Sequence, residues 1–154
     1  MRFDHIGVLV SDLDAGKRAI AEQLGARWVE PEHELLVECD ALAPCALGGV
    51  IDWDTVPLLR CEVICGCANN QLADAGIADA LAERGILYAP DYVVNAGGLI
   101  HVYREIRGYS EAEAIELVLA IETTLDRVLE LADEHAITPL AAAEELARER
   151  LAAA

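Results

Sequence analysis

Lysine is almost absent from this sequence, since Lys17 is the only one among 154 residues. The 11 basic residues face 28 acidic ones, which leaves a formal net charge of −17. A phosphate backbone or an anionic membrane surface would repel such a chain. We therefore expect neither nucleic acid nor a membrane as a partner.

Long apolar runs are also missing, although 55% of the residues are hydrophobic. Charges and glycines interrupt every run before it reaches the length of a membrane span. Asp4 stands where the cationic part of a signal peptide would lie, and no long apolar run follows it. The sequence therefore predicts a folded, cytoplasmic protein with one hydrophobic core.

No Cys-x-x-Cys pair occurs among the five cysteines, and the four histidines are scattered. An odd number of cysteines with apolar neighbours does not indicate a disulfide framework. Cys61, Cys65 and Cys67 lie in and just after an expected strand, where zinc binding is an alternative. We expect buried cysteines that act as small hydrophobic side chains, and no metal site.

Short apolar runs alternate with helical segments in the first two thirds of the chain, which predicts a parallel α/β sheet with crossover connections. Strands are expected at His5–Val10, Arg27–Val29, Asp40–Ala43, Cys61–Cys65 and Ile86–Tyr88. Helices are expected at Ala15–Leu24, Pro31–Val37, Thr55–Leu59 and Ala73–Arg84.

The pattern changes after Asn95, where helices follow one another. Ser110 and Glu113 form a capping-box pattern, and Thr138 followed by Pro139 is typical of a helix start. We expect helices at Ile100–Ile106, at Ser110–His135 and from Thr138 onward.

Three motifs follow the ends of expected strands. They are Cys39–Gly49 (CDALAPCALGG), Gly66–Leu72 (GCANNQL) and Gly85–Tyr92 (GILYAPDY), the last running on to Asn95–Gly98 (NAGG). In order and spacing they resemble the cofactor domain of the leucine, phenylalanine and valine amino-acid dehydrogenases, over about residues 8 to 150. The resemblance implies oxidative deamination of a branched-chain or aromatic L-amino acid, with NAD as cofactor.

The residues of these motifs suit a ligand site, because open α/β sheets bind ligands at the carboxyl ends of their strands. Asn69 and Asn70 offer amide donors and acceptors, although a turn explains an Asn-Asn pair equally well. The resemblance implies cofactor-binding roles for Asp12, Cys45, Ala46, Asn69 and Asn70.

Asp12 follows the first expected strand. An acidic residue there accepts hydrogen bonds from the adenosine ribose and disfavours a 2′-phosphate, which favours NAD over NADP; a helix-capping turn would use the same residue. By resemblance, Asn70, Leu99 and Val102 line the pocket for the substrate side chain, although two aliphatic residues three apart also fit a core. His101 departs from the family, and we expect it to be solvated.

Two features of the family are missing. The family uses one lysine to bind the substrate carboxylate and a second to activate water, with an aspartate assisting. Lys17, on the helix after the first strand, fits neither role. The glycine fingerprint GxGxxG, which holds a pyrophosphate at a helix N-terminus, is also absent. We therefore expect a chain truncated at its N-terminus and inactive without a complementing catalytic domain.

The expected fold is a partial Rossmann-like parallel sheet without the usual first strand, in residues 1–95, with a helical extension, residues 96–154, packed on it as one compact domain. Either the strand at His5–Val10 takes the central place of the missing strand or another chain supplies the pairing, because unpaired central backbone is costly. A homo-oligomer is expected.

Two other functions stay open. One is a non-catalytic module for dinucleotide binding or oligomerisation. The other rests on Met1–Asp14, which resembles the opening of glyoxalase-like vicinal-oxygen-chelate proteins, where a histidine matching His5 binds a metal. That fold needs ligands on later strands, which the helix-rich remainder does not offer.

Overall fold

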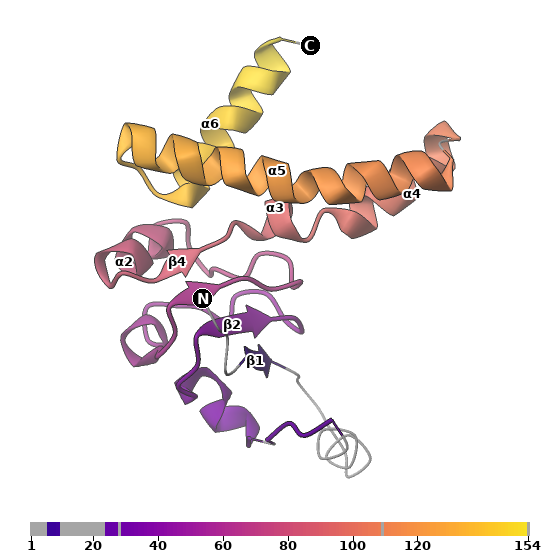
Figure 1. Cartoon of the computed structure of the whole chain (residues 1–154). Coiled ribbons are helices and arrows are strands. Elements are labelled where there is room, and N and C mark those ends of the chain that lie inside the picture. The colour runs from indigo at the N-terminus through magenta and orange to yellow at the C-terminus, as the bar shows by residue number, and fades with distance from the viewer. Residues whose placement is uncertain (1–5, 10–23, 28, 109, 154) are drawn as a thin grey trace.

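The computed structural model of the chain describes residues 6–9, 24–27, 29–108 and 110–153. Four parallel strands in the order β1-β2-β3-β4 form one sheet, with helices around it (Figure 1). The predicted parallel α/β sheet is therefore confirmed. The elements are β1 (Ile6–Leu9), η1 (Pro31–Leu36), β2 (Ala41–Pro44), η2 (Val56–Leu58), β3 (Val63–Ile64), α2 (Ile77–Glu83), β4 (Leu87–Tyr88), α3 (Asp91–Val94), α4 (Gly97–Arg107), α5 (Glu111–His135) and α6 (Pro139–Ala152).

Several predicted elements differ in the structure: α3 was not predicted, α4 begins at Gly97 rather than Ile100, and β3 is shorter than Cys61–Cys65. The strand expected at Arg27–Val29 is wrong, because Arg27 and Val29 lie in irregular backbone just before the proline that starts η1. The helix expected from Ala73 begins only at Ile77, because the Asp74 side chain accepts the N–H of Gly76 at 2.8 Å and holds this stretch in a turn.

The N-terminal strand β1 pairs directly with β2. Ile6 lies opposite Ala41 and Leu9 opposite Pro44, so no described strand separates the two. Within the described sheet β1 forms one edge and β4 the other. Asp12, Lys17 and most of the helix expected at Ala15–Leu24 lie outside the described residues, and the replacement of a missing central strand stays a prediction.

Two hydrophobic clusters support the fold. The first lies around the sheet, where β2, β3 and α2 bury Leu42, Ile64 and Leu81 almost completely. The second joins α5 to α6 around the fully buried Val128 and Ala142, and it includes Val93 of α3. Removing these apolar side chains from water supplies most of the stabilisation.

The long helix α5 begins as the sequence predicts. The Ser110 hydroxyl accepts the N–H of Glu113 at 3.3 Å, and the Glu113 carboxylate accepts the N–H of Ser110 at 2.7 Å, which completes the capping box. The last helix, α6, has Thr138 as its N-cap residue, also as predicted. Both starts are local, so the sequence alone could locate them.

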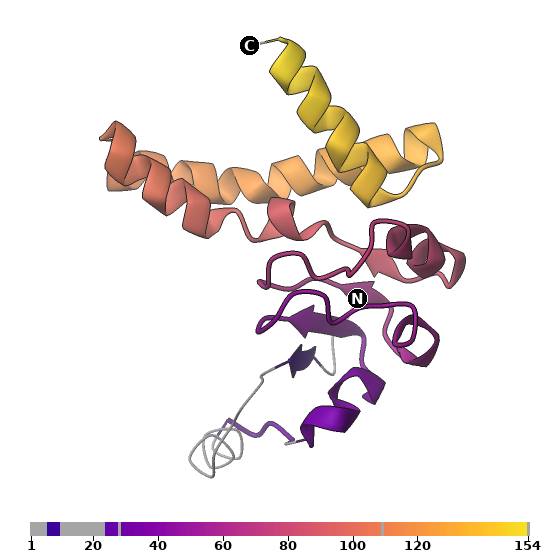
Figure 2. The same cartoon turned by 180° about the vertical axis from the view of Figure 1, so that it is seen from behind.

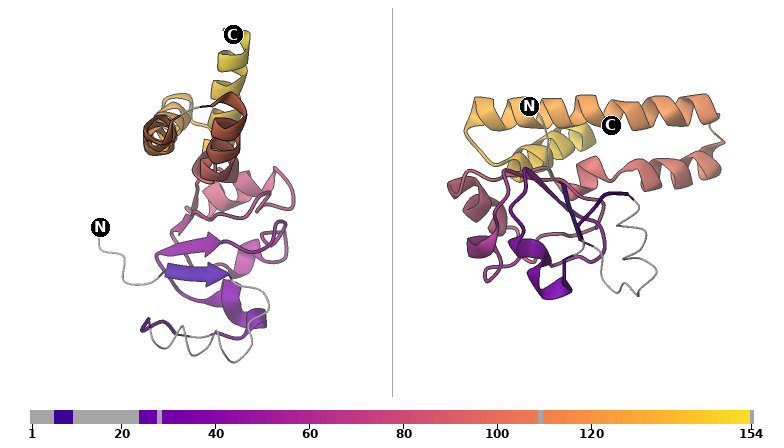
Figure 3. Two further views of the ribbon diagram at one scale, coloured as in Figure 1. Left: turned by 90° about the vertical axis from the view of Figure 1, so that its right-hand side faces the viewer. Right: turned by 60° about the horizontal axis from the view of Figure 1, so that its bottom comes forward.

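Helix α4 lies alongside the first half of α5, and both extend past the sheet (Figures 2 and 3). No residue of α4 is buried. Its apolar side chains Leu99 and Ile106 are 73% and 75% exposed, which leaves one apolar face of this helix open. None of the described helices is both long and apolar enough to cross a membrane.

Candidate functional site at the carboxyl edge of the sheet

The loops that follow β2 and β3 run side by side at the carboxyl edge of the sheet. The N–H of Ala68 donates to the Pro44 carbonyl at 2.9 Å, and the N–H of Gly49 donates to the Asn70 carbonyl at 2.7 Å. Gly48 fits only because it lacks a side chain: a Cβ there would lie 2.5 Å from the Asn69 carbonyl oxygen. Backbone contacts therefore join the first motif to the second.

A buried glutamine closes the second loop. Gln71 is fully buried, and its Nε2 donates to the carbonyls of Gly66 at 2.8 Å and Ala68 at 2.9 Å. Asn70 has a φ of +52°, in the left-handed region that asparagine tolerates better than most residues. These features present the exposed side chains of Asn69 and Asn70 at the edge of the sheet.

The third motif supports this loop through Asp91, a buried carboxylate at the start of α3. It accepts the N–H of Asn70 at 2.5 Å and the hydroxyl of Tyr88 at 3.1 Å. Burial raises the pKa of Tyr88, and the negative charge of Asp91 raises it further, so the hydroxyl stays a donor. Asn95 reaches the same loop, because its Nδ2 donates to Asn69 Oδ1 at 2.7 Å.

The structure brings four of the predicted site residues together. Cys45 and Ala46 stand on the first loop beside Asn69 and Asn70 on the second, and all four are exposed. The pocket residues Leu99 and Val102 are exposed on α4, so they are not part of either hydrophobic cluster. Asp12 lies outside the described residues. His101 is exposed and lies 3.8 Å from Glu105 in the next turn of α4, as expected for a solvated histidine.

The sequence reasoning missed Asp91, Asn95 and Gln71. Asp91 carries the clearest signal that could have revealed it, since it is an acidic residue just after a short apolar strand. Its partner Asn70 is 21 positions away, and no local pattern predicts that contact. All three act by positioning Asn69 and Asn70.

The prediction that the cysteines are buried is wrong for most of them. Cys39 alone is buried, Cys61 is half-buried, and Cys45, Cys65 and Cys67 are exposed. The exposed three lie beyond the last paired residues of β2 and β3, where the loops open to solvent. Among the described residues, no group of His, Cys, Asp or Glu side chains is arranged to hold a metal ion.

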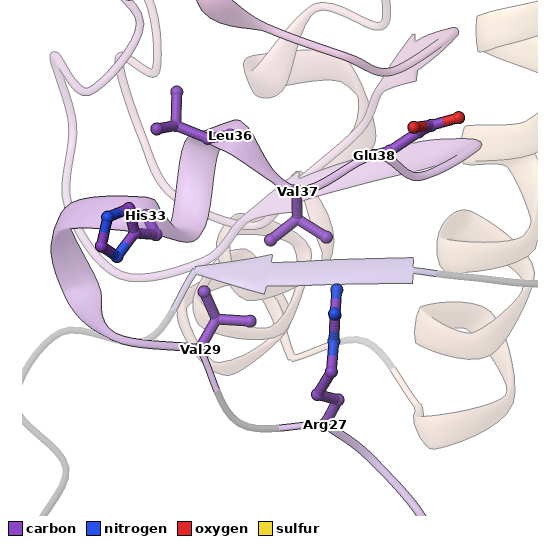
Figure 4. A pocket seen from close by; sticks show the side chains of 6 residues that line it. All are labelled: Arg27, Val29, His33, Leu36, Val37 and Glu38. Atoms are coloured by element: carbon purple, nitrogen blue, oxygen red, sulfur yellow. The ribbon is translucent and has the colours of Figure 1, made fainter.

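A surface hollow of about 450 Å³ lies elsewhere, beside β1 and η1 (Figure 4). All of its lining comes from one short stretch of chain, and it contains none of the predicted site residues. A single arginine and a single glutamate supply its charge, so it lacks the convergent polar groups of the carboxyl edge. The residues that line it are Arg27, Val29, His33, Leu36, Val37 and Glu38.

The chain is similar to proteins of a known family. Residues 8–154 match the family described as Glutamate/Leucine/Phenylalanine/Valine dehydrogenase. The chain is 44% identical over 147 residues to leucine dehydrogenase of Bacillus cereus, covering 94% of this chain and 40% of that protein. It therefore spans about two fifths of the length of this relative.

Two solved structures are similar. L-tryptophan dehydrogenase from Nostoc punctiforme superposes with a TM-score of 0.87 at 43% identity, over 93% of this chain and 44% of that one. The hetero-hexameric glutamate dehydrogenase from Thermus thermophilus, in its Leu-bound form, superposes with a TM-score of 0.67 at 25% identity, over 90% of this chain and 36% of that one.

Proposed function

The chain belongs to the Glutamate/Leucine/Phenylalanine/Valine dehydrogenase family, and on this premise we propose that it is the cofactor-binding part of an NAD-dependent enzyme that deaminates L-amino acids oxidatively. One observation carries the proposal: hydrogen bonds and close packing bring the family's three motifs together at the carboxyl edge of the sheet. The family match begins at residue 8, within the segment that resembles glyoxalase-like proteins, and therefore disfavours the glyoxalase-like alternative.

The residues at this edge fit a dinucleotide. Asn69 and Asn70 present exposed amides that can donate to and accept from ribose hydroxyls or a carboxamide. The neighbouring loop at Cys45 and Ala46 is open to solvent beside them. When bound, NAD would accept a hydride from the α-carbon of the amino acid. The preference for NAD over NADP rests on Asp12, as an acceptor for the ribose hydroxyls.

The substrate pocket that we propose combines Asn70 with Leu99 and Val102. Two aliphatic side chains favour a branched aliphatic amino acid, in keeping with the name of leucine dehydrogenase. Leu99 and Val102 are 73% and 51% exposed, so the other wall of such a pocket has to come from beyond the described residues.

Like the other wall of the pocket, the lysines that this chemistry requires have to come from outside the described residues. Lys17 is the only lysine in the sequence, and we propose that polypeptide beyond these 154 residues binds the substrate carboxylate and activates water. An oligomeric, cytoplasmic assembly suits this arrangement, as the hetero-hexameric relative illustrates. A non-catalytic dinucleotide-binding or oligomerisation module is the second candidate, and the presence of only one lysine favours it.

The first prediction concerns turnover. The purified chain, given NAD with L-leucine, L-valine or L-phenylalanine, is expected to form no NADH, because no lysine pair is present to hold the carboxylate and activate water. A spectrophotometric assay measures this, with leucine dehydrogenase of Bacillus cereus as the positive control. Amino-acid-dependent turnover that disappears in Lys17→Ala would show that the chain supplies its own catalytic lysine and would overturn this part of the proposal.

A further inference from the structure

Two exposed thiols lie on neighbouring loops at the carboxyl edge of the sheet. Cys45 follows β2 directly, and Cys67 lies just beyond β3. Both side chains are exposed, and they are close enough for the charge of Cys45 to raise the pKa of Cys67. Cys65 is near enough to interact electrostatically with both.

The backbone fixes the separation of the pair. Gly66 packs against Pro44 so closely that a Cβ on Gly66 would overlap the Pro44 carbonyl oxygen. The N–H of Ala68 donates to that same oxygen at 2.9 Å. Cys45 follows Pro44 and Cys67 follows Gly66, and the register of β2 and β3, continued past their last paired residues, places the two level with each other. Neighbouring strands lie about 4.8 Å apart, which falls within the Cα separation of about 4.4 to 6.8 Å that a disulfide spans.

We propose that Cys45 and Cys67 form a redox-sensitive pair whose disulfide blocks the dinucleotide site. Cys45 belongs to the loop assigned to the cofactor, so the regulatory half of the proposal rests on the proposed function. A bridge from Cys45 to Cys67 ties this loop to the segment just before Asn69 and Asn70. The cofactor would then lose access to the Cys45 side of the site.

The chemistry balances with a peroxide as oxidant. One thiolate attacks hydrogen peroxide, the O–O bond breaks, and a sulfenic acid and one water form. The second thiol then displaces the sulfenic oxygen as a second water, which creates the S–S bond. Two thiols thus lose two electrons and two protons while peroxide gains them. A dithiol reductant reverses the step by exchange.

The neighbourhood of Cys67 disfavours its ionisation. The pKa of Cys67 is raised, first by the negative charge of Cys45 and next by desolvation. A raised pKa lowers the thiolate fraction and slows attack on peroxide. Burial raises the pKa of Cys61 to about 11, which makes it a slower competitor.

Peptide mapping tests the disulfide. Trypsin cleaves after Arg60, which separates the peptide with Cys45 from the peptide with Cys67. After peroxide treatment of the folded chain, a non-reducing digest is expected to contain these two peptides linked. The link should vanish in Cys67→Ala and persist in Cys65→Ala and Cys61→Ala. A link that persists in Cys67→Ala, or none in the wild-type chain, would overturn the pair.

Calorimetry tests the effect on the cofactor. Peroxide is expected to weaken NAD binding at least tenfold in the wild-type chain, with recovery after dithiothreitol and no change in Cys67→Ala. Equal NAD affinities for the oxidised and reduced chains would overturn the regulatory role. If the reduced chain binds no NAD at all, both the proposed function and the regulatory role are wrong. The existence of the disulfide is tested separately, by the digest.

Discussion

Replacing Gly66 by alanine is expected to lower the free energy of unfolding by about 3 kcal/mol, at the upper end of the usual cost of overpacking. A Cβ at this position would overlap the Pro44 carbonyl oxygen and would lie 2.5 Å from the Pro44 nitrogen. Backbone atoms of β2 cannot rotate away as a flexible side chain can. Either β3 moves away from β2 or the hydrogen bond from Ala68 to Pro44 lengthens. Urea denaturation followed by circular dichroism measures the change.

Gly98→Ala is the matched control. A Cβ at Gly98 would meet no atom within 4 Å, and the residue lies in the first turn of α4. Alanine there should stabilise the chain by about 0.5 to 1 kcal/mol, because it restricts the unfolded backbone and favours the helix. If Gly66→Ala unfolds at the same urea concentration as the wild-type chain, the close approach of β2 and β3 is wrong.

Replacing Asp91 by alanine is expected to lower the free energy of unfolding by about 2 to 3 kcal/mol. The carboxylate accepts the N–H of Asn70 and the hydroxyl of Tyr88, and alanine leaves both donors without this acceptor. Hydrogen bonds to charged groups are among the stronger ones, and unpaired buried donors add a desolvation penalty. The Asn70 loop should also become more mobile, which amide hydrogen exchange at Asn70 would measure.

Asp91→Asn removes the negative charge of this side chain and keeps its shape. Asparagine keeps one oxygen for the N–H of Asn70 and can donate its amide to the Tyr88 oxygen, so we expect a loss of only about 1 kcal/mol. Tyr88→Phe removes the other partner and should cost a similar amount. An alanine variant no less stable than the asparagine variant would mean that Asp91 does not hold the loop.

Local patterns predicted much of the fold. The short strands, the capping box at Ser110 and the start of α6 at Thr138 all depend on residues within a few positions of one another. The strand predicted at Arg27–Val29 was wrong, because Arg27 and Val29 have no partner strand in the described sheet. A strand requires a neighbour, and a single sequence does not show which segments become neighbours.

The candidate site was only half predictable for the same reason. Asn69 and Asn70 could be chosen from the motif, but the carboxylate that holds Asn70 comes from a distant segment. Leu99 and Val102 have the spacing of core residues, and only the structure shows that nothing described covers them. The apolar run Cys61–Cys65 predicted a longer strand than β3, which ends at Ile64. Cys65 and Cys67 therefore lie beyond the strand and are exposed.

The central claim is that the carboxyl edge of the sheet holds a dinucleotide. The most direct test is to measure the binding of NAD to the reduced chain. Isothermal titration calorimetry should detect saturable binding, weakened about fivefold in Asn70→Gly, since a neutral hydrogen bond contributes about 1 kcal/mol. Glycine keeps the left-handed backbone at this position, where φ is +52°, and removes only the amide. Glu122→Ala, on the exposed surface of α5, should bind as the wild-type chain does. No detectable binding at millimolar NAD, or equal affinity in Asn70→Gly, would contradict the assignment of this edge.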